Sequence, residues 1–219
     1  TFMGVLSGQI IAGAASDLGT GVSTSISFLL MGVAVFGYIT SRRIKVVEEE
    51  PTDIVKDSIE PISFTYKTAR WARSVKGLNT TVLGLGGFWL VAALIQMNIY
   101  EHAPLVYGLS NTGTAVVMAL IAIGIGLGCF LAGKLSKHRV ELGMVPLGGL
   151  GLSVILTIFA TTELSLYPFV FCLFAAAMFS GFYKVPLSAW IQERVSGRQL
   201  GKALAYNQLM AFLFILVAA

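Results

Sequence analysis

The chain has 219 residues, of which 56% are hydrophobic and only 12% are charged, and its mean hydropathy is +0.81. A water-soluble domain of this length cannot cover so much apolar surface, so these values exclude an ordinary soluble protein and indicate an integral membrane protein. The net charge of +4 would suit a nucleic-acid partner in a soluble protein. Here the cations mark one side of a membrane, and we predict no nucleic-acid partner.

Seven apolar segments are the candidate membrane-spanning helices, each of which needs roughly 20 residues. We predict them at residues 2–15, 21–40, 80–100, 112–133, 142–161, 166–190 and 203–219. The first and last are short, and the chain opens without Met and stops inside an apolar run, which predicts that it is part of a longer protein. The expected fold is therefore all-α, a polytopic bundle of transmembrane helices.

Lys and Arg residues gather in alternate loops. Fourteen of the 15 lie in the loops 42–78, 134–141 and 191–202. The intervening loops carry as ionisable groups only Asp17, Glu101, His102 and Glu163. Because cytoplasmic loops are enriched in Lys and Arg, we expect the three basic loops, and Thr1 with them, on the cytoplasmic side. This orientation argues against a seven-helix receptor, whose first terminus lies outside the cell.

The basic loop 42–78 divides the chain into two units, residues 1–41 and 79–219. Its middle is acidic and its end is basic and aromatic. In that end, four residues share one helical face: Phe64, Thr68, Trp71 and Val75. This pattern is typical of an amphipathic helix that rests on anionic membrane lipids, and a solvated linker is the alternative.

Small residues are dense inside the predicted spans. Gly124, Gly126 and Gly128 lie within one apolar helix, where they predict a packing surface and not a dinucleotide-binding loop. The two cysteines, Cys129 and Cys172, lie in separate spans without the spacing of metal ligands. We therefore predict buried thiols, with no metal site, disulfide or cofactor.

Polar side chains inside the spans are candidates for a substrate path, because placing them in lipid costs free energy. Lys184 is the only Lys or Arg outside the basic loops, roughly 15 Å from the inner one by helix rise. Either it faces a cavity, where it would suit a phosphate or carboxylate, or its ammonium group reaches back to the interface. The other candidates, each of which alternatively makes only an interhelical hydrogen bond, are Tyr183, Gln96, Asn98, Gln9 and Asn207.

Two prolines are candidate hinges. Pro186 lacks the backbone N–H of a helical residue, so we expect the helix to kink or end there, and Pro146 has a similar position near the start of its span. The alternative is that both prolines are merely tolerated.

Residues 131–148, preceded by the Gly-rich residues 124–128, resemble the inner loop between helices eight and nine of the lysophospholipid transporter branch of the major facilitator superfamily. Residues 88–98 resemble helix seven of the same branch, and residues 181–187 with Ile191 and Gln192 resemble helix ten. The resemblance covers most of the chain from Asn79 onward and is weaker before it.

This resemblance implies a partial major facilitator fold of about seven of twelve helices. Residues 1–41 would be the last two helices of the N-terminal half, residues 42–78 the central cytoplasmic loop, and residues 79–219 the first five helices of the C-terminal half. It also implies transport of lysophospholipid, mainly lysophosphatidylethanolamine, across the bacterial inner membrane by alternating access. The implied partners are lipids and, as in some relatives, a fused or associated acyltransferase; the helices themselves would not be an enzyme.

The resemblance also indicates a cytoplasmic gating loop, with Gly133, Ser136, Arg139 and Glu141 as its candidate residues. Four residues after Gly133, Lys137 stands where the superfamily has an aspartate, so the usual acidic latch is in doubt. Arg139 and Glu141 could supply a substitute charge pair.

Three alternatives change the function. A major facilitator transporter of another small solute or drug would use an ionisable pair inside the membrane, and the predicted spans contain no Asp or Glu. The helices could instead anchor a fused acyltransferase. A membrane-embedded enzyme is disfavoured, because His102 and His138 lie in loops on opposite sides of the membrane.

Overall fold

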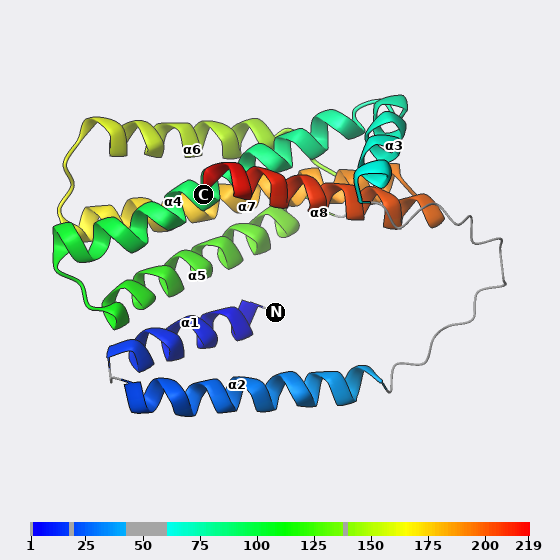
Figure 1. The fold of residues 1–219 in the computed structure, drawn as a ribbon. Coiled ribbons are helices and arrows are strands. Elements are labelled where there is room, and N and C mark those ends of the chain that lie inside the picture. Colours follow the sequence, from blue (N-terminus) through cyan, green and yellow to red (C-terminus); the bar gives the residue numbers. More distant parts are fainter. Residues whose placement is uncertain (1, 18–19, 43–60, 138–139) are drawn as a thin grey trace.

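The computed structural model describes residues 2–17, 20–42, 61–137 and 140–219, and every regular element in these ranges is an α-helix (Figure 1). The helices are α1 (Phe2–Asp17), α2 (Thr20–Ser41), α3 (Pro61–Ser74), α4 (Leu78–Tyr107), α5 (Asn111–Leu135), α6 (Met144–Thr161), α7 (Leu166–Arg194) and α8 (Arg198–Ala218). Each of the seven predicted spans coincides with one helix, and the amphipathic segment forms α3.

Five of the described helices, α4 to α8, are long and apolar enough to cross a membrane. The described part of α2 contributes a shorter apolar stretch, Ser27–Ser41. The predicted all-α polytopic bundle is therefore confirmed. The span predicted to end at residue 100 continues as α4 to Tyr107, and Gly108 ends it in the left-handed conformation with φ 63°.

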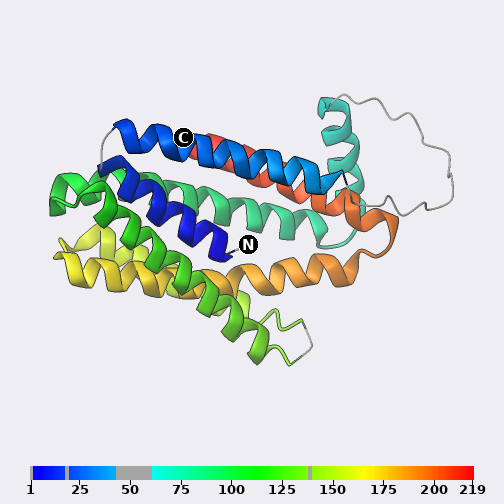
Figure 2. The ribbon, with the colours of Figure 1, turned by 90° about the horizontal axis from the view of Figure 1, so that it is seen from below.

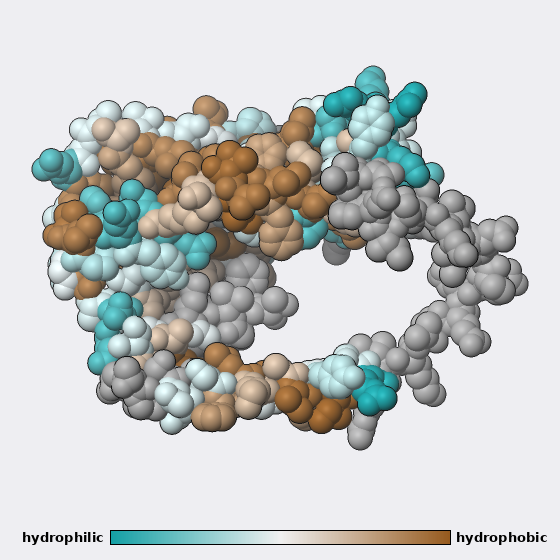
Figure 3. Space-filling model, viewed as in Figure 1, coloured by the Kyte–Doolittle hydropathy of each residue, from teal (hydrophilic) through white to brown (hydrophobic). Residues whose placement is uncertain are grey.

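The helices pack in pairs along the bundle (Figures 1 and 2). In these pairs α7 contacts α5 and α6, α4 contacts α8, and α1 contacts both α5 and α2. Figure 3 shows an open space between α2 and the helices above it, on the side toward α3. The helices α2 and α8 overlap in Figure 2, but Figure 1 shows them apart, with α1 and α5 between them.

Glycine sets the distance between α5 and α7. A Cβ atom added at Gly128 would meet the backbone of Met178, and one added at Gly181 would meet the backbone of Gly128 and Cys129. Gly126, on the same helix as Gly128, has nothing within 4 Å of such an atom. The predicted packing surface is thus present at Gly128, and the two backbones approach as closely as glycine allows.

The helix α3 lies across the inner ends of α4 and α8 (Figure 1). Thr68 and Ala72 on α3 are both 0% exposed, and Trp71 and Val75 pack against a buried apolar cluster. We call it the inner core cluster: Ala72, Leu78, Val82, Leu85, Leu187, Ile191, Val195, Ala203 and Tyr206. The prediction that this face of α3 rests on lipid is wrong for Thr68, which is fully buried, because α4 and α8 contact α3; the side chain of Phe64 lies outside the described residues.

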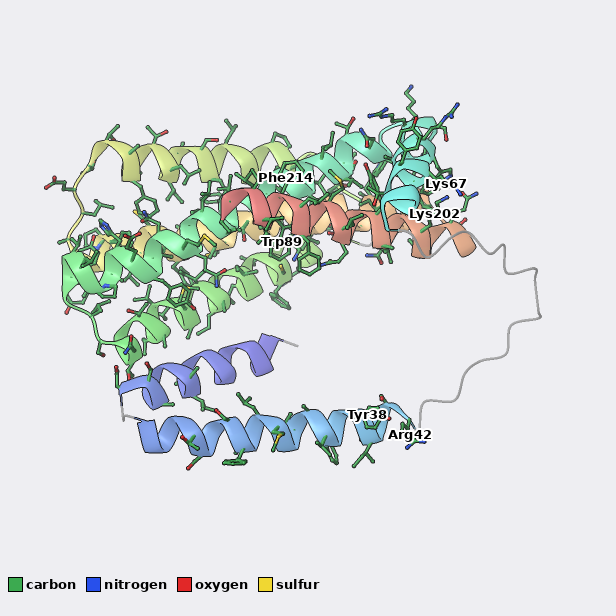
Figure 4. The ribbon with its side chains drawn as sticks, in the orientation of Figure 1. Tyr38, Arg42, Lys67, Trp89, Lys202 and Phe214 are labelled. Atoms are coloured by element: carbon green, nitrogen blue, oxygen red, sulfur yellow. The ribbon has the colours of Figure 1, made fainter. Side chains whose placement is uncertain are left out.

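Charge and hydropathy divide the described surface as a bilayer requires. Figure 4 shows Arg42, Lys67 and Lys202 at the same end of the molecule, Lys67 and Lys202 at α3 and Arg42 at the end of α2. Figure 3 shows hydrophilic residues gathered over α3 and apolar ones along the helix flanks. Large exposed side chains such as Phe28, Phe36 and Phe212 are suited to lipid contact, since in water they would form an unusual apolar surface.

Candidate functional site

Lys184 and Trp89 bring α7 and α4 together inside the bundle. The Nζ atom of Lys184 lies over the indole ring, 4.5 Å from its centroid, and both side chains are partly buried. Figure 4 places Trp89 in the middle part of the bundle, away from α3. A cation over an aromatic face is attracted by the ring quadrupole, so Trp89 fixes the position of the ammonium group.

The third helix at this place is α5. Because Gly181 touches the backbone of Gly128 and Cys129, the turn of α7 that carries Lys184 lies next to Cys129. We call Trp89, Cys129 and Lys184 the Lys184 site. Such a site can bind an anionic group beside apolar and aromatic surface.

Tyr183 precedes Lys184 but has a mainly structural environment. Its hydroxyl group donates a hydrogen bond of 3.3 Å to the carbonyl oxygen of Gly84, and its ring stacks on Phe88 with centroids 5.9 Å apart. A Cβ atom at Gly148 of α6 would meet the Tyr183 backbone. Tyr183 therefore packs α7 against α4 and α6.

A cavity of about 750 Å³ lies at the outer end of the bundle, between α4, α6 and α7. Asn98 and His102 line it, whereas Gln96 is exposed and does not. The hydroxyl group of Tyr107 donates a hydrogen bond of 2.8 Å to the carbonyl oxygen of Leu164 and joins α4 to the loop before α7. The cavity thus combines apolar walls with a few polar groups at the outer side.

The gating-loop candidates lie at the inner end. Gly133 and Ser136 line a pocket of about 490 Å³ together with Pro186 and Glu193. The Ser136 hydroxyl group donates a hydrogen bond of 2.7 Å to the carbonyl oxygen of Ala132. Arg139 lies outside the described residues and Glu141 is exposed, so their predicted pairing stays a prediction.

The two hinge candidates differ in position. The helix α7 continues through Pro186, which is buried, to Arg194, so the expectation that the helix could end at Pro186 is wrong. Pro146 is exposed and lies in the first turn of α6, where a backbone N–H has no helical acceptor to lose. A kink at Pro186 stays a prediction.

The two remaining candidates lie on other helices than Lys184, on α1 and α8. Gln9 is in α1, and its side chain falls outside the described part of the structure. Asn207 on α8 is partly buried, and its Oδ1 atom has no hydrogen-bond partner. Its neighbour Tyr206 donates a hydrogen bond of 3.2 Å to the side-chain oxygen of Asn79 on α4.

Sequence reasoning missed the roles of Trp89, Cys129 and Asp17. Trp89 was visible only as part of a resembling segment, and nothing in spacing along the chain indicates that it meets Lys184, 95 positions later. Asp17 was assigned only to an outer loop, although its carboxylate caps α5. These are contacts between distant helices, which periodicity within one helix cannot predict.

The helices and their charge distribution define a multi-pass helical membrane protein. The chain is 25% identical over 213 residues to the protein named lysophospholipid transporter LplT of Photorhabdus laumondii, covering 95% of this chain and 52% of that relative. It is 30% identical over 115 residues to proteins of the same name from Salmonella paratyphi B and Salmonella newport, covering 52% of this chain and 28% of each relative. These relatives confirm the resemblance to lysophospholipid transporters.

The chain spans about half the length of the Photorhabdus relative. No family model matches it, and no solved structure gives a significant match.

Proposed function

We propose that the chain is part of a lysophospholipid transporter of the major facilitator superfamily in the inner membrane of a bacterium. Its likeness to proteins named lysophospholipid transporters extends over 95% of its length, which supports this function over transport of an unrelated solute. In this proposal residues 1–41 end the N-terminal half, residues 42–78 form the central cytoplasmic loop, and residues 79–219 begin the C-terminal half. We propose a transporter and not an enzyme, and a fused or associated acyltransferase stays a prediction.

The observation that carries the proposed mechanism is the position of Lys184, whose ammonium group is held over Trp89 where α4, α5 and α7 meet. A lysophospholipid has one phosphate and one acyl chain. The ammonium group would donate hydrogen bonds to the phosphate, while Phe88, Trp89 and neighbouring apolar side chains would contact the chain. The phosphate would thereby replace water around a partly buried cation.

We propose alternating access as the mechanism. At the outer end α1 is joined to α5 through Asp17, and transport would require this contact to open.

The test is uptake of fluorescent lysophosphatidylethanolamine by proteoliposomes that contain the full-length protein, followed as loss of albumin-extractable lipid from the outer leaflet. Lys184→Gln should lower uptake by about tenfold or more, because a hydrogen bond to a charged group contributes ~1.5–3 kcal/mol. Lys184→Arg should retain part of it, and Lys134→Gln, at the inner end of α5, is the matched control.

Unchanged uptake in correctly inserted Lys184→Gln and Lys184→Ala would exclude Lys184 as the phosphate contact. If the folded wild-type protein does not accelerate lipid loss over empty vesicles, the lysophospholipid function itself is wrong, and transport of another solute or a role as an anchor replaces it.

A further inference from the structure

The side of α3 that faces away from the bundle is basic. Lys67, Arg70 and Arg73 are spaced by three residues, so they lie on one side of the helix, and all three are exposed. Lys76, in the turn that follows α3, is also exposed. Figure 4 shows nitrogen-tipped side chains projecting from α3 beyond the outline of the bundle. We call these four residues the α3 basic face.

The opposite side of α3 holds the helix firmly in this position. Thr68 and Ala72 are fully buried, and Nζ of Lys202 on α8 lies 5.3 Å from the centroid of the Trp71 ring. The turn after α3 is fixed as well, because a Cβ atom at Gly77 would be 3.0 Å from the ring of Trp190. The α3 basic face is therefore presented outward by a helix that cannot turn over without uncovering the inner core cluster.

The helix α3 lies at one end of helices that are long enough to span a membrane. It crosses the ends of α4 and α8, two helices that can span a bilayer, and Arg42 lies at the same end of the molecule (Figure 4). Tyr66 on α3 is 69% exposed, and tyrosine is enriched at the level of lipid headgroups. The helix itself, Pro61–Ser74, contains no Asp or Glu, so its own charges are all positive.

We propose that the α3 basic face binds the phosphate groups of anionic phospholipids in the inner leaflet. Arginine suits this role because its planar guanidinium group can donate two parallel hydrogen bonds to one phosphate. This surface is separate from the Lys184 site and does not depend on what the protein transports. Since the opposite side of α3 covers the inner core cluster, bound anionic lipid also stabilises the packing of α3 on α4 and α8.

The test measures lipid binding to the purified full-length protein in neutral detergent by native mass spectrometry, with phosphatidylglycerol and phosphatidylcholine as probes. The test variant is Arg70→Gln/Arg73→Gln/Lys76→Gln. The matched control, Lys134→Gln/Lys137→Gln/Arg194→Gln, removes three exposed cations elsewhere at the predicted cytoplasmic side and lowers the net charge by the same three units as the test variant. Circular dichroism and size-exclusion chromatography establish that both variants are folded.

A cation near an anionic lipid surface contributes roughly fivefold in affinity, so the test variant should bind phosphatidylglycerol at least about tenfold more weakly than the wild type. The control should change by less than about twofold, and added salt should weaken the wild-type binding. Equal losses in the two triple variants, or equal wild-type affinity for the two lipids, would overturn the proposal.

Unchanged phosphatidylglycerol binding by the test variant would also overturn it. In that case the acidic residues Glu48, Glu49 and Glu50 of the same loop are the rival occupant of the α3 basic face. Substituting these three by Gln in the wild type would then raise phosphatidylglycerol binding. Because neither probe is a lysophospholipid, these outcomes are independent of the uptake assay.

Discussion

The carboxylate of Asp17 at the end of α1 accepts a hydrogen bond of 2.7 Å from the backbone N–H of Thr112 in the first turn of α5. The backbone N–H of Asn111 donates to the same carboxylate over 3.2 Å. The first N–H groups of a helix lack helical acceptors and attract negative charge. These contacts lower the pKa of Asp17 from 3.8 to about 2. The largest contributions are hydrogen bonds from the side chain and the backbone of Thr112, and those from Asn111 are smaller.

Asp17→Ala should therefore loosen the outer contact between α1 and α5. We expect faster amide hydrogen exchange at residues 111–113 than in the wild type, because two of these N–H groups lose their acceptor. Glu101→Ala, which removes another exposed outer carboxylate, is the control and should leave exchange there unchanged. Equal exchange in Asp17→Ala and the wild type would show that the carboxylate does not hold this contact.

The same contact should depend on pH only under acidic conditions. A carboxyl group whose pKa is lowered in the folded state contributes stability above its unfolded pKa, and this contribution is lost as pH falls from about 3.8 through about 2. Exchange at residues 111–113, corrected for its intrinsic pH dependence, should be constant from pH 7 to pH 5. A change within that range would mean that another group controls the contact.

Gly128→Ala should destabilise the contact between α5 and α7, because the new Cβ atom would meet the backbone of Met178. Overpacking of this kind costs about 1–3 kcal/mol, measurable as a lower free energy of unfolding in mixed micelles. Gly126→Ala, on the same helix with open space at the new atom, should be neutral or more stable, since alanine favours helix. Equal effects of the two substitutions would contradict the close backbone approach.

Lysophospholipid should protect Cys129 from a thiol reagent if it occupies the Lys184 site. In a Cys172→Ser background, where Cys129 is the remaining cysteine of the chain, maleimide labelling should be slower with saturating lysophosphatidylethanolamine. A Cys129→Ser background should show no protection at Cys172. Protection of both thiols alike would indicate a general effect of the lipid on the membrane and not binding at the site.

The hydrogen bond from Tyr206 to Asn79 should couple α8 to α4. A double-mutant cycle of Tyr206→Phe and Asn79→Ala, read as free energies of unfolding, should give a coupling energy of about 0.6 kcal/mol, the average for such bonds between membrane helices. Tyr206→Phe combined with Gly126→Ala, which is on a different helix, should be additive. A coupling energy of zero in the first cycle is the contrary result.

The sequence predicted the helices well because apolar spans depend on local composition, and their orientation in the membrane stays a prediction. The apolar segments identify α1, α2 and α4 to α8, and the basic loops identify the end at which α3 lies. Even the helical face of Thr68, Trp71 and Val75 was recognised correctly. The sequence of α3 does not show what covers this face, since apolar side chains are equally suited to contact with protein and with lipid. The covering helix α8 is also distant in the chain, because four helices lie between α3 and α8.

The candidate site shows the same limit. Lys184 was noticed because a lysine inside an apolar segment is costly, but its partner Trp89 is on another helix, and tryptophan is common in membrane helices. Ser136 and Pro186 were chosen for unrelated reasons, and the structure places both at one pocket. Contacts between residues of different helices depend on how the helices pack. In this chain the packing depends on specific close contacts, such as that of Gly128 with the backbone of Met178.

The covering of α3 by α8 has a consequence for synthesis of the chain. Ribosomes make α8 about 120 residues after α3, which at ~5–20 residues per second is a delay of roughly 6 to 24 s. Throughout that interval Trp71 and Val75 lack part of their final protein contacts. The inner core cluster is completed only after α8 has been made, because Ala203 and Tyr206 belong to it.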